Sequence, residues 1–182
     1  MISEKRLARI AWRRSRAYQS LAATFSPPGQ HSASRHSREY TRLFVAPRPL
    51  VYPYESMHRG ACQRVMADST LDVVRRYREA GFLIPPTWPE LPDHITLELF
   101  FMSALAKNEA ERQQTGAHER AHALAHLQRR FMEDHLLHWV SEFCEDVLSA
   151  SPNASFRKAA DDLRQLLPRD HDWLVALTAK ET

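Results

Sequence analysis

The chain has 182 residues, of which 43% are hydrophobic, and this suits a single domain over residues 1–182 rather than a disordered protein. Its four glycines are scattered, so no glycine-rich loop can cradle a phosphate as the dinucleotide-binding and P-loop motifs do. No apolar run is long enough to span a bilayer, and the net charge is +3.

The first helix is expected at residues 4–25, where apolar side chains recur every three or four positions and form one stripe. Arg14 falls on this stripe, so its side chain must either extend to solvent or meet a buried acid. Residues 12–16 resemble the arginine pair of an export signal, but helical periodicity continues through 17–21 where such a signal needs an uncharged apolar stretch. We therefore expect a cytoplasmic protein that is not exported.

Two proline-rich segments follow in the middle of the chain. The first, at 45–56, comes after a short helix expected at 36–44, and the second, at 85–92, comes after a helix expected at 61–80. Gly81 is a natural stop for that helix. Because proline removes backbone donors and fixes one dihedral angle, both segments are expected to be stiff loops that suit a recognition surface.

A central helix is expected at 92–107, beginning at Pro92, because apolar residues surround most of its circumference. Glu98 lies among them, and its carboxyl group is expected to be paired or to have a raised pKa. Further helices are expected at 117–132, 134–149, 155–167 and 170–180. Pro168 is expected to end the third of these. No segment alternates with period two, so the sequence predicts an all-α helical bundle.

The histidines and cysteines do not predict a metal centre or a disulfide. His118, His122 and His126 have a spacing that can bring imidazoles to one metal ion. They lie away from the apolar face, however, and no nearby residue completes a four-ligand set, so surface histidines without a metal or other cofactor are favoured. Cys62 and Cys144 are far apart and have no adjacent histidine or aspartate, which favours two reduced thiols.

A polar group at the start of the central helix is a second candidate site. Asp93, His94 and Glu98 lie close together there, and the favoured interpretation is a buried network that fixes the helix entry. Partner binding is the next alternative, and catalysis is the least favoured, so no catalytic residue is assigned. His135 and His138 flank an apolar helix and are explained by packing.

The stretch 91–95, Leu-Pro-Asp-His-Ile, with Glu98-Leu99 and Phe101-Met102, resembles the central motif of the TorD/DmsD/NarJ-like family of redox-enzyme maturation chaperones. Further stretches at 21–28, 40–45, 53–56 and 131–143 are similar to the family's pattern in order and spacing. The resemblance covers about residues 18–150 and implies a TorD-like helical fold without catalytic activity. It does not extend to functional residues after position 150.

The resemblance also implies a partner. Such a chaperone binds the twin-arginine signal peptide and the apo form of a molybdoenzyme of the dimethyl sulfoxide reductase type, and holds it until cofactor insertion and export. It implies neither nucleic-acid binding nor stable membrane insertion, and it is compatible with a monomer or a domain-swapped dimer. The positions that carry over as the signal-peptide site are Pro92, Asp93 and His94, with Tyr52, Glu55, Ser56 and Trp88 as groove neighbours.

The chemistry of this site is that of a receptor for arginine followed by an apolar run. Carboxylates can pair with guanidinium groups in two-point contacts, and Asp93, Glu55 and Glu90 are the candidates. An aromatic groove for the apolar run is drawn from Tyr52, Tyr54, Trp88 and Phe101. If this is right, replacing Asp93 or His94 weakens leader binding and leaves melting nearly unchanged.

The first helix supports a different hypothesis. Six basic residues lie in the first sixteen positions, which is compatible with a basic helical nucleic-acid-binding module. The same helix has an apolar face, so a solvated basic face of a packed helix is favoured over a nucleic-acid-binding arm.

Overall fold

The computed structural model describes residues 3–29, 34–59 and 68–179, and over these residues the chain is helical, as predicted. The elements are α1 (Glu4–Phe25), α2 (Arg35–Tyr40), the π-helical turn η1 (Thr41–Val45), α3 (Glu55–His58), α4 (Asp68–Glu79), α5 (Ile95–Gln114), α6 (His118–Asp134), the 3-10 turn η2 (Leu136–His138), α7 (Val140–Ala150) and α8 (Ala154–Thr178). None of the described helices is long and apolar enough to cross a bilayer. The all-α prediction is confirmed.

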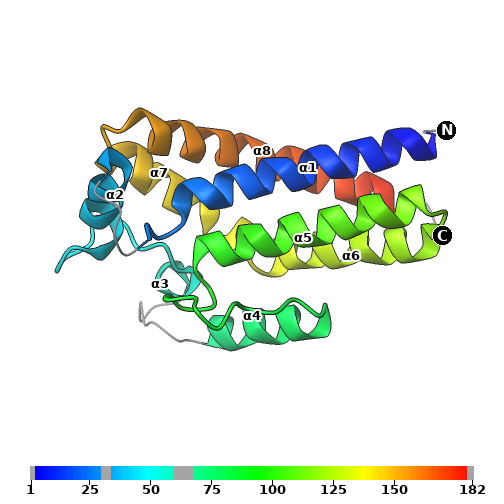
Figure 1. Cartoon of the computed structure of the whole chain (residues 1–182), viewed down its shortest axis with the longest axis horizontal. Helices are drawn as coiled ribbons and strands as arrows, with labels where there is room; N and C mark the ends of the chain where they lie inside the picture. Colours follow the sequence, from blue (N-terminus) through cyan, green and yellow to red (C-terminus); the bar gives the residue numbers. More distant parts are fainter. Residues whose placement is uncertain (1–2, 30–33, 60–67, 180–182) are drawn as a thin grey trace.

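Four long helices form the bundle. In Figure 1, α1, α5, α6 and α8 lie along one axis, and each runs antiparallel to the helices that it contacts. The shorter α7 packs on α8, and the start of α1 and the end of α8 lie at the same end of the bundle. Helix α4 lies outside these four, and its buried Tyr77 packs against Phe101 of α5 and Phe131 of α6.

Helix α5 is the central element that the sequence predicts, but its limits differ from the expected 92–107. It begins at Ile95 with His94 as the N-cap, and it continues to Gln114. The later start has a backbone cause, because the Ile95 amide donates to the Pro53 carbonyl at 2.9 Å. Residues just before α5 are thus held in extended pairing with another segment, and Pro92 lies outside the helix.

Helix α8 corrects the prediction that Pro168 ends a helix. Pro168 lies inside one continuous helix, so the two helices expected at 155–167 and 170–180 are a single element. Proline costs a helix interior about 3 kcal/mol through its missing donor and its ring. Burial of Leu167 and Leu174 on either side of it, together with the buried pairing of Asp170 described below, outweighs this cost.

Two further helices also differ from their expected limits. The helix expected at 61–80 is described from Asp68 to Glu79, and residues 61–67 lie outside the described part. Gly81 follows with φ of 70°, as expected of a glycine that ends a helix. The helix expected at 134–149 is divided by the turn η2 before α7 begins.

Candidate functional site

The two proline-rich segments meet in front of α5 at a contact that we call the loop junction, formed by Tyr54, Glu55, Ser56, Asp93 and His94. Tyr54 and His94 form an isolated antiparallel bridge. The Glu55 amide donates to the Asp93 carbonyl at 3.0 Å, and the Ser56 amide donates to Asp93 Oδ2 at 2.9 Å. The Asp93 side chain therefore bonds the end of the first segment to the end of the second.

His94 holds the junction from the second segment. Its Nδ1 accepts a hydrogen bond from the Thr96 amide at 3.1 Å, so Nε2 carries the proton and faces the Tyr40 hydroxyl at 3.3 Å. The rings of Tyr54 and Trp88 pack edge-on against its imidazole. Burial lowers the pKa of His94 to about 3, which keeps the ring neutral as a helix cap.

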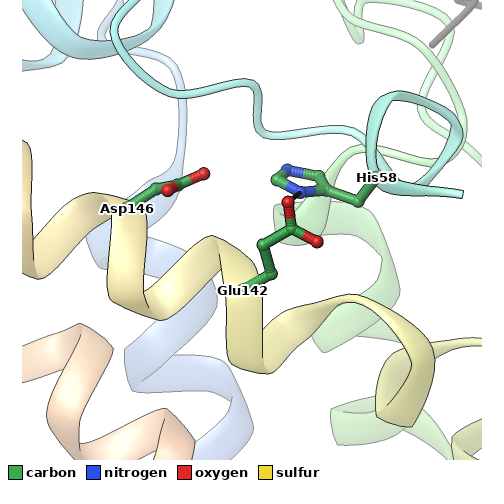
Figure 2. A group of neighbouring side chains, drawn as sticks. All are labelled: His58, Glu142 and Asp146. Atoms are coloured by element: carbon green, nitrogen blue, oxygen red, sulfur yellow. Dashed lines mark ion pairs between the residues drawn. The ribbon is translucent and has the colours of Figure 1, made fainter.

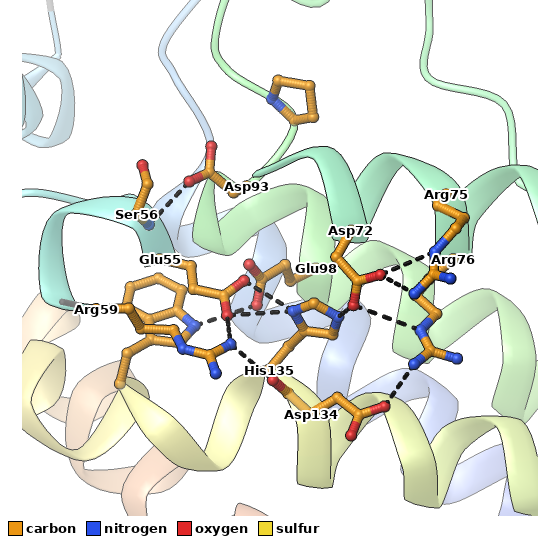
Figure 3. Close-up of polar contacts among 12 residues, drawn as sticks. Glu55, Ser56, Arg59, Asp72, Arg75, Arg76, Asp93, Glu98, Asp134 and His135 are labelled. Carbon is orange, nitrogen blue, oxygen red and sulfur yellow. Dashed lines mark hydrogen bonds and ion pairs between the residues drawn. The ribbon is translucent and has the colours of Figure 1, made fainter. Parts of the chain in front are cut away.

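A cluster of charged groups lies beneath the junction (Figure 3). Glu55 accepts a hydrogen bond from His135 Nδ1 at 3.0 Å and pairs with Arg59. The other nitrogen of His135, Nε2, lies 3.2 Å from Asp72 Oδ2 on α4. His135 thus stands between two carboxylates, a role that the packing interpretation missed and that only the spatial proximity of α3, α4 and η2 reveals.

Glu98 is a buried acidic member of this cluster. Its Oε2 accepts a hydrogen bond from Trp139 Nε1 at 3.3 Å. Burial, followed by the nearby carboxylates Glu55 and Asp93, raises the pKa of Glu98 well above its ordinary value. The expectation of a paired or raised carboxyl group is confirmed on both counts.

The structure brings the predicted site residues together but does not expose all of them. Tyr52 is 40% exposed, and Trp88 and Pro92 are half-buried. The other four are fully buried: Glu55, Ser56, Asp93 and His94. The expectation that Asp93 and Glu55 lie open to a leader's arginines is therefore corrected, because neither carboxylate is exposed to solvent. Phe101, also a groove candidate, belongs to the core.

Two buried polar atoms at the junction form no hydrogen bond. Among the described residues, Asp93 Oδ1 and Ser56 Oγ have no hydrogen-bond partner. Buried polar atoms are nearly always bonded, and an unpaired carboxylate oxygen is costly. The junction therefore has acceptor capacity that an incoming donor could use if it were uncovered.

Beside the cluster lies a surface pocket with a volume of about 610 Å³. The residues that line the pocket carry both signs of charge: Arg59, Asp68, Ser69, Asp72, Arg76, Asp134 and His135. Several are already paired, as Arg76 is with Asp134 at 2.7 Å. This mixed, internally neutralised lining does not suit a strongly charged ligand.

Some basic side chains of α1 lie on the surface, and one lies in the core. Lys5, Arg9, Arg13 and Arg16 are exposed beside Trp12. Arg14 is buried and bonds to the acids of other helices, so the second of the two alternatives for this side chain is confirmed. The nucleic-acid hypothesis thereby loses one of the six charges on which it is based.

The other candidates form local contacts. His118 Nδ1 lies 3.0 Å from Gln113 Oε1, and its Nε2 lies 3.0 Å from Glu4 Oε1. The rings of His122 and His126 pack against each other. Cys144 is a free, buried thiol whose pKa is raised to about 12 by burial, while Cys62 lies outside the described residues.

Comparison with known families returns a match for most of the chain. The family model described as nitrate reductase delta subunit matches residues 11–145. This range begins within α1, includes the loop junction and the charged cluster, and ends within α7. Among curated proteins, no sequence matches significantly.

Proposed function

Because the chain belongs to the nitrate reductase delta subunit family, whose members are non-catalytic chaperones of molybdoenzyme maturation, we propose that it binds the twin-arginine signal peptide of its client. In this proposal the client is a molybdoenzyme of the dimethyl sulfoxide reductase type. The chaperone holds its apo form in the cytoplasm until the cofactor has been inserted, and then releases it for export.

The observation that carries the proposal is an exposed apolar surface on the first proline-rich segment. Val45, Leu50 and Tyr52 expose 55%, 53% and 40% of their surface, although each is a large apolar side chain. They are three of the seven large apolar residues that are exposed in the described part of the chain. Exposed apolar side chains that gather on one segment typically mark a binding surface.

The second segment supplies the polar part of the proposed site. Glu90 is half-buried and accepts a hydrogen bond from the Tyr54 hydroxyl at 2.6 Å, which holds its carboxylate between the two segments. A fixed carboxylate on the same two segments as Tyr52 and Trp88 suits an arginine followed by an apolar run. Glu55, Ser56, Asp93 and His94 are proposed to keep the two segments together, with the free oxygen of Asp93 as a further acceptor.

A synthetic peptide tests this proposal. Its sequence would contain two adjacent arginines followed by an apolar run, and its binding would be followed by fluorescence anisotropy. We expect saturable binding that the double variant Tyr52→Ala/Trp88→Ala weakens roughly tenfold or more, because aromatic anchors carry much of the energy of such contacts.

Two controls make the result specific. A peptide with two lysines in place of the arginines should bind more weakly, since lysine lacks the planar two-point contact. Val175→Ala, which removes an exposed apolar side chain from α8, should leave the affinity unchanged. Equal binding by the wild type and the double variant would show that the leader does not use this surface.

A further inference from the structure

We propose that His58, Glu142 and Asp146 form a binding site for one divalent transition-metal ion of the zinc type, which joins α3 to α7. One ligand atom from each residue lies within 4.8 Å of the others (Figure 2). Among the described residues this is the only group of three such side chains with that spacing. The site goes beyond the proposed function and does not depend on it.

The backbone directs the three side chains to one point. Glu142 and Asp146 are four residues apart on α7, so they project from the same face on successive turns. His58 is the last residue of α3, and it approaches that face from the opposite side. Figure 2 shows both carboxylates directed toward the imidazole.

The hydrogen bonding of His58 prepares it as a ligand. Its Nε2 lies 2.8 Å from the carbonyl oxygen of Tyr52. A carbonyl can only accept, so Nε2 carries the proton and the lone pair of the neutral ring is on Nδ1. Histidines that bind metals usually donate their second nitrogen to a carbonyl or carboxylate in this way.

The free nitrogen of His58 faces negative charge. Nδ1 lies 3.7 Å from Glu142 Oε1, which is longer than a hydrogen bond. The side chain is held in this orientation because it is only 5% exposed and packs against the Trp139 ring at 5.3 Å. An electron pair directed at carboxylates is unfavourable unless a positive charge, either a proton on Nδ1 or a metal ion, lies between them.

The ligand set indicates the class of cation. Imidazole favours zinc and similar transition metals, whereas magnesium and calcium prefer sites made only of oxygen. Ligand atoms that are about 2.0–2.2 Å from one ion are ~3–4 Å apart, so a small rearrangement completes the site. Glu142, whose side chain is 63% exposed, is free to make it.

Glu142 and Asp146 place two negative charges on successive turns of α7. A cation between them would compensate their repulsion. With three protein ligands, a zinc-type ion keeps one position for water.

Zinc titration of the untagged, chelator-treated chain by calorimetry tests the proposal. The parent for all comparisons carries His122→Ala and His126→Ala, which removes a competing pair of histidines. We expect one equivalent of Zn²⁺ to bind to this parent. Adding Glu142→Gln and Asp146→Asn should weaken the affinity about tenfold or more, because both amides keep the shape and lose the charge.

The matched control is Glu145→Gln, which removes a neighbouring exposed carboxylate from the same helix and should keep the parent's affinity. Co²⁺ gives a second readout, since its visible absorption should appear on binding to the parent and be absent from the double-amide variant. Glu142→Gln alone, at an exposed position, should also weaken binding. Substoichiometric binding to the parent, or equal affinity of the double-amide variant and Glu145→Gln, would overturn the assignment.

Discussion

Arg14 of α1 and Asp170 of α8 form a two-point ion pair in the interior of the bundle. Nε and Nη2 of Arg14 both donate to the carboxylate, and Tyr18 also donates to Asp170 Oδ2, at 2.5 Å. Nη1 donates to Glu109 of α5 at 2.8 Å, and Nη2 also donates to Gln128 of α6 at 2.6 Å. One side chain therefore contacts all the other long helices of the bundle.

Replacing Arg14 by methionine should lower the free energy of unfolding by about 3–5 kcal/mol, because Glu109 and Asp170 would remain buried without their counter-charge. Urea denaturation followed by circular dichroism measures this change. Arg13→Met removes an exposed arginine from the adjacent position and should change stability by less than about 0.5 kcal/mol. Similar losses in the two variants would contradict a structural role for the buried pair.

Pro168→Ala should stabilise the protein by about 1–2 kcal/mol. Alanine restores the missing helix donor, worth about 3 kcal/mol in a helix interior, and part of this gain is offset because proline also restricts the unfolded chain. Pro168 is exposed, so little packing is lost. Thermal and urea denaturation measure the gain, with Arg169→Ala at the next exposed position as the control. A destabilised Pro168→Ala variant would show that α8 is not continuous in solution.

Pro168 also shows why part of the fold could not be predicted. The all-helical class and the places of the long helices follow from local periodicity, and they are confirmed for α1, α5 and α6. The local rule for proline fails in α8 because Asp170 is bound by Arg14, a residue 156 positions earlier in the chain. The sequence left open whether Arg14 extends to solvent or meets a buried acid, and it could not indicate which acid.

The sequence analysis favoured a buried network for Asp93, His94 and Glu98, and all three are buried. The signal-peptide hypothesis, in contrast, needed carboxylates that are open to solvent. Asp93 does bond to Glu55 and Ser56, and His94 pairs with Tyr54, although these residues lie far apart in the sequence. Whether such groups face solvent depends on how the two proline-rich segments pair, and no periodicity encodes that. The expectation that replacing Asp93 or His94 leaves melting nearly unchanged must therefore be revised.

His94→Ala should lower the free energy of unfolding by about 2 kcal/mol or more, because it removes both the cap of α5 and a buried ring. His94→Asn should lose less, since asparagine is a good N-cap and its side-chain oxygen can still accept from the Thr96 amide. Urea denaturation ranks the two variants. An equal loss in both would mean that His94 Nδ1 does not cap the helix.

Glu98→Gln should make the protein more stable than the wild type at neutral and alkaline pH. The folded-state pKa of Glu98 is raised, first by burial, so the native state binds a proton that the unfolded state has released. The stability that this proton provides is complete below the ordinary pKa of 4.5 and is lost as pH rises through the folded-state pKa. Glutamine imitates the protonated form and cannot lose it.

The two melting curves should therefore agree most closely at the acid end and separate as pH rises, with the variant above. Melting temperatures measured from about pH 4 to about pH 9 test both the sign and the window of the difference. Glutamine can still accept from Trp139 Nε1, so the hydrogen bond at 3.3 Å does not confound the comparison. Glu111→Gln, an exposed change on the same helix, should follow the wild type throughout. A Glu98→Gln variant that loses stability toward high pH as steeply as the wild type would show that Glu98 is charged in the folded protein.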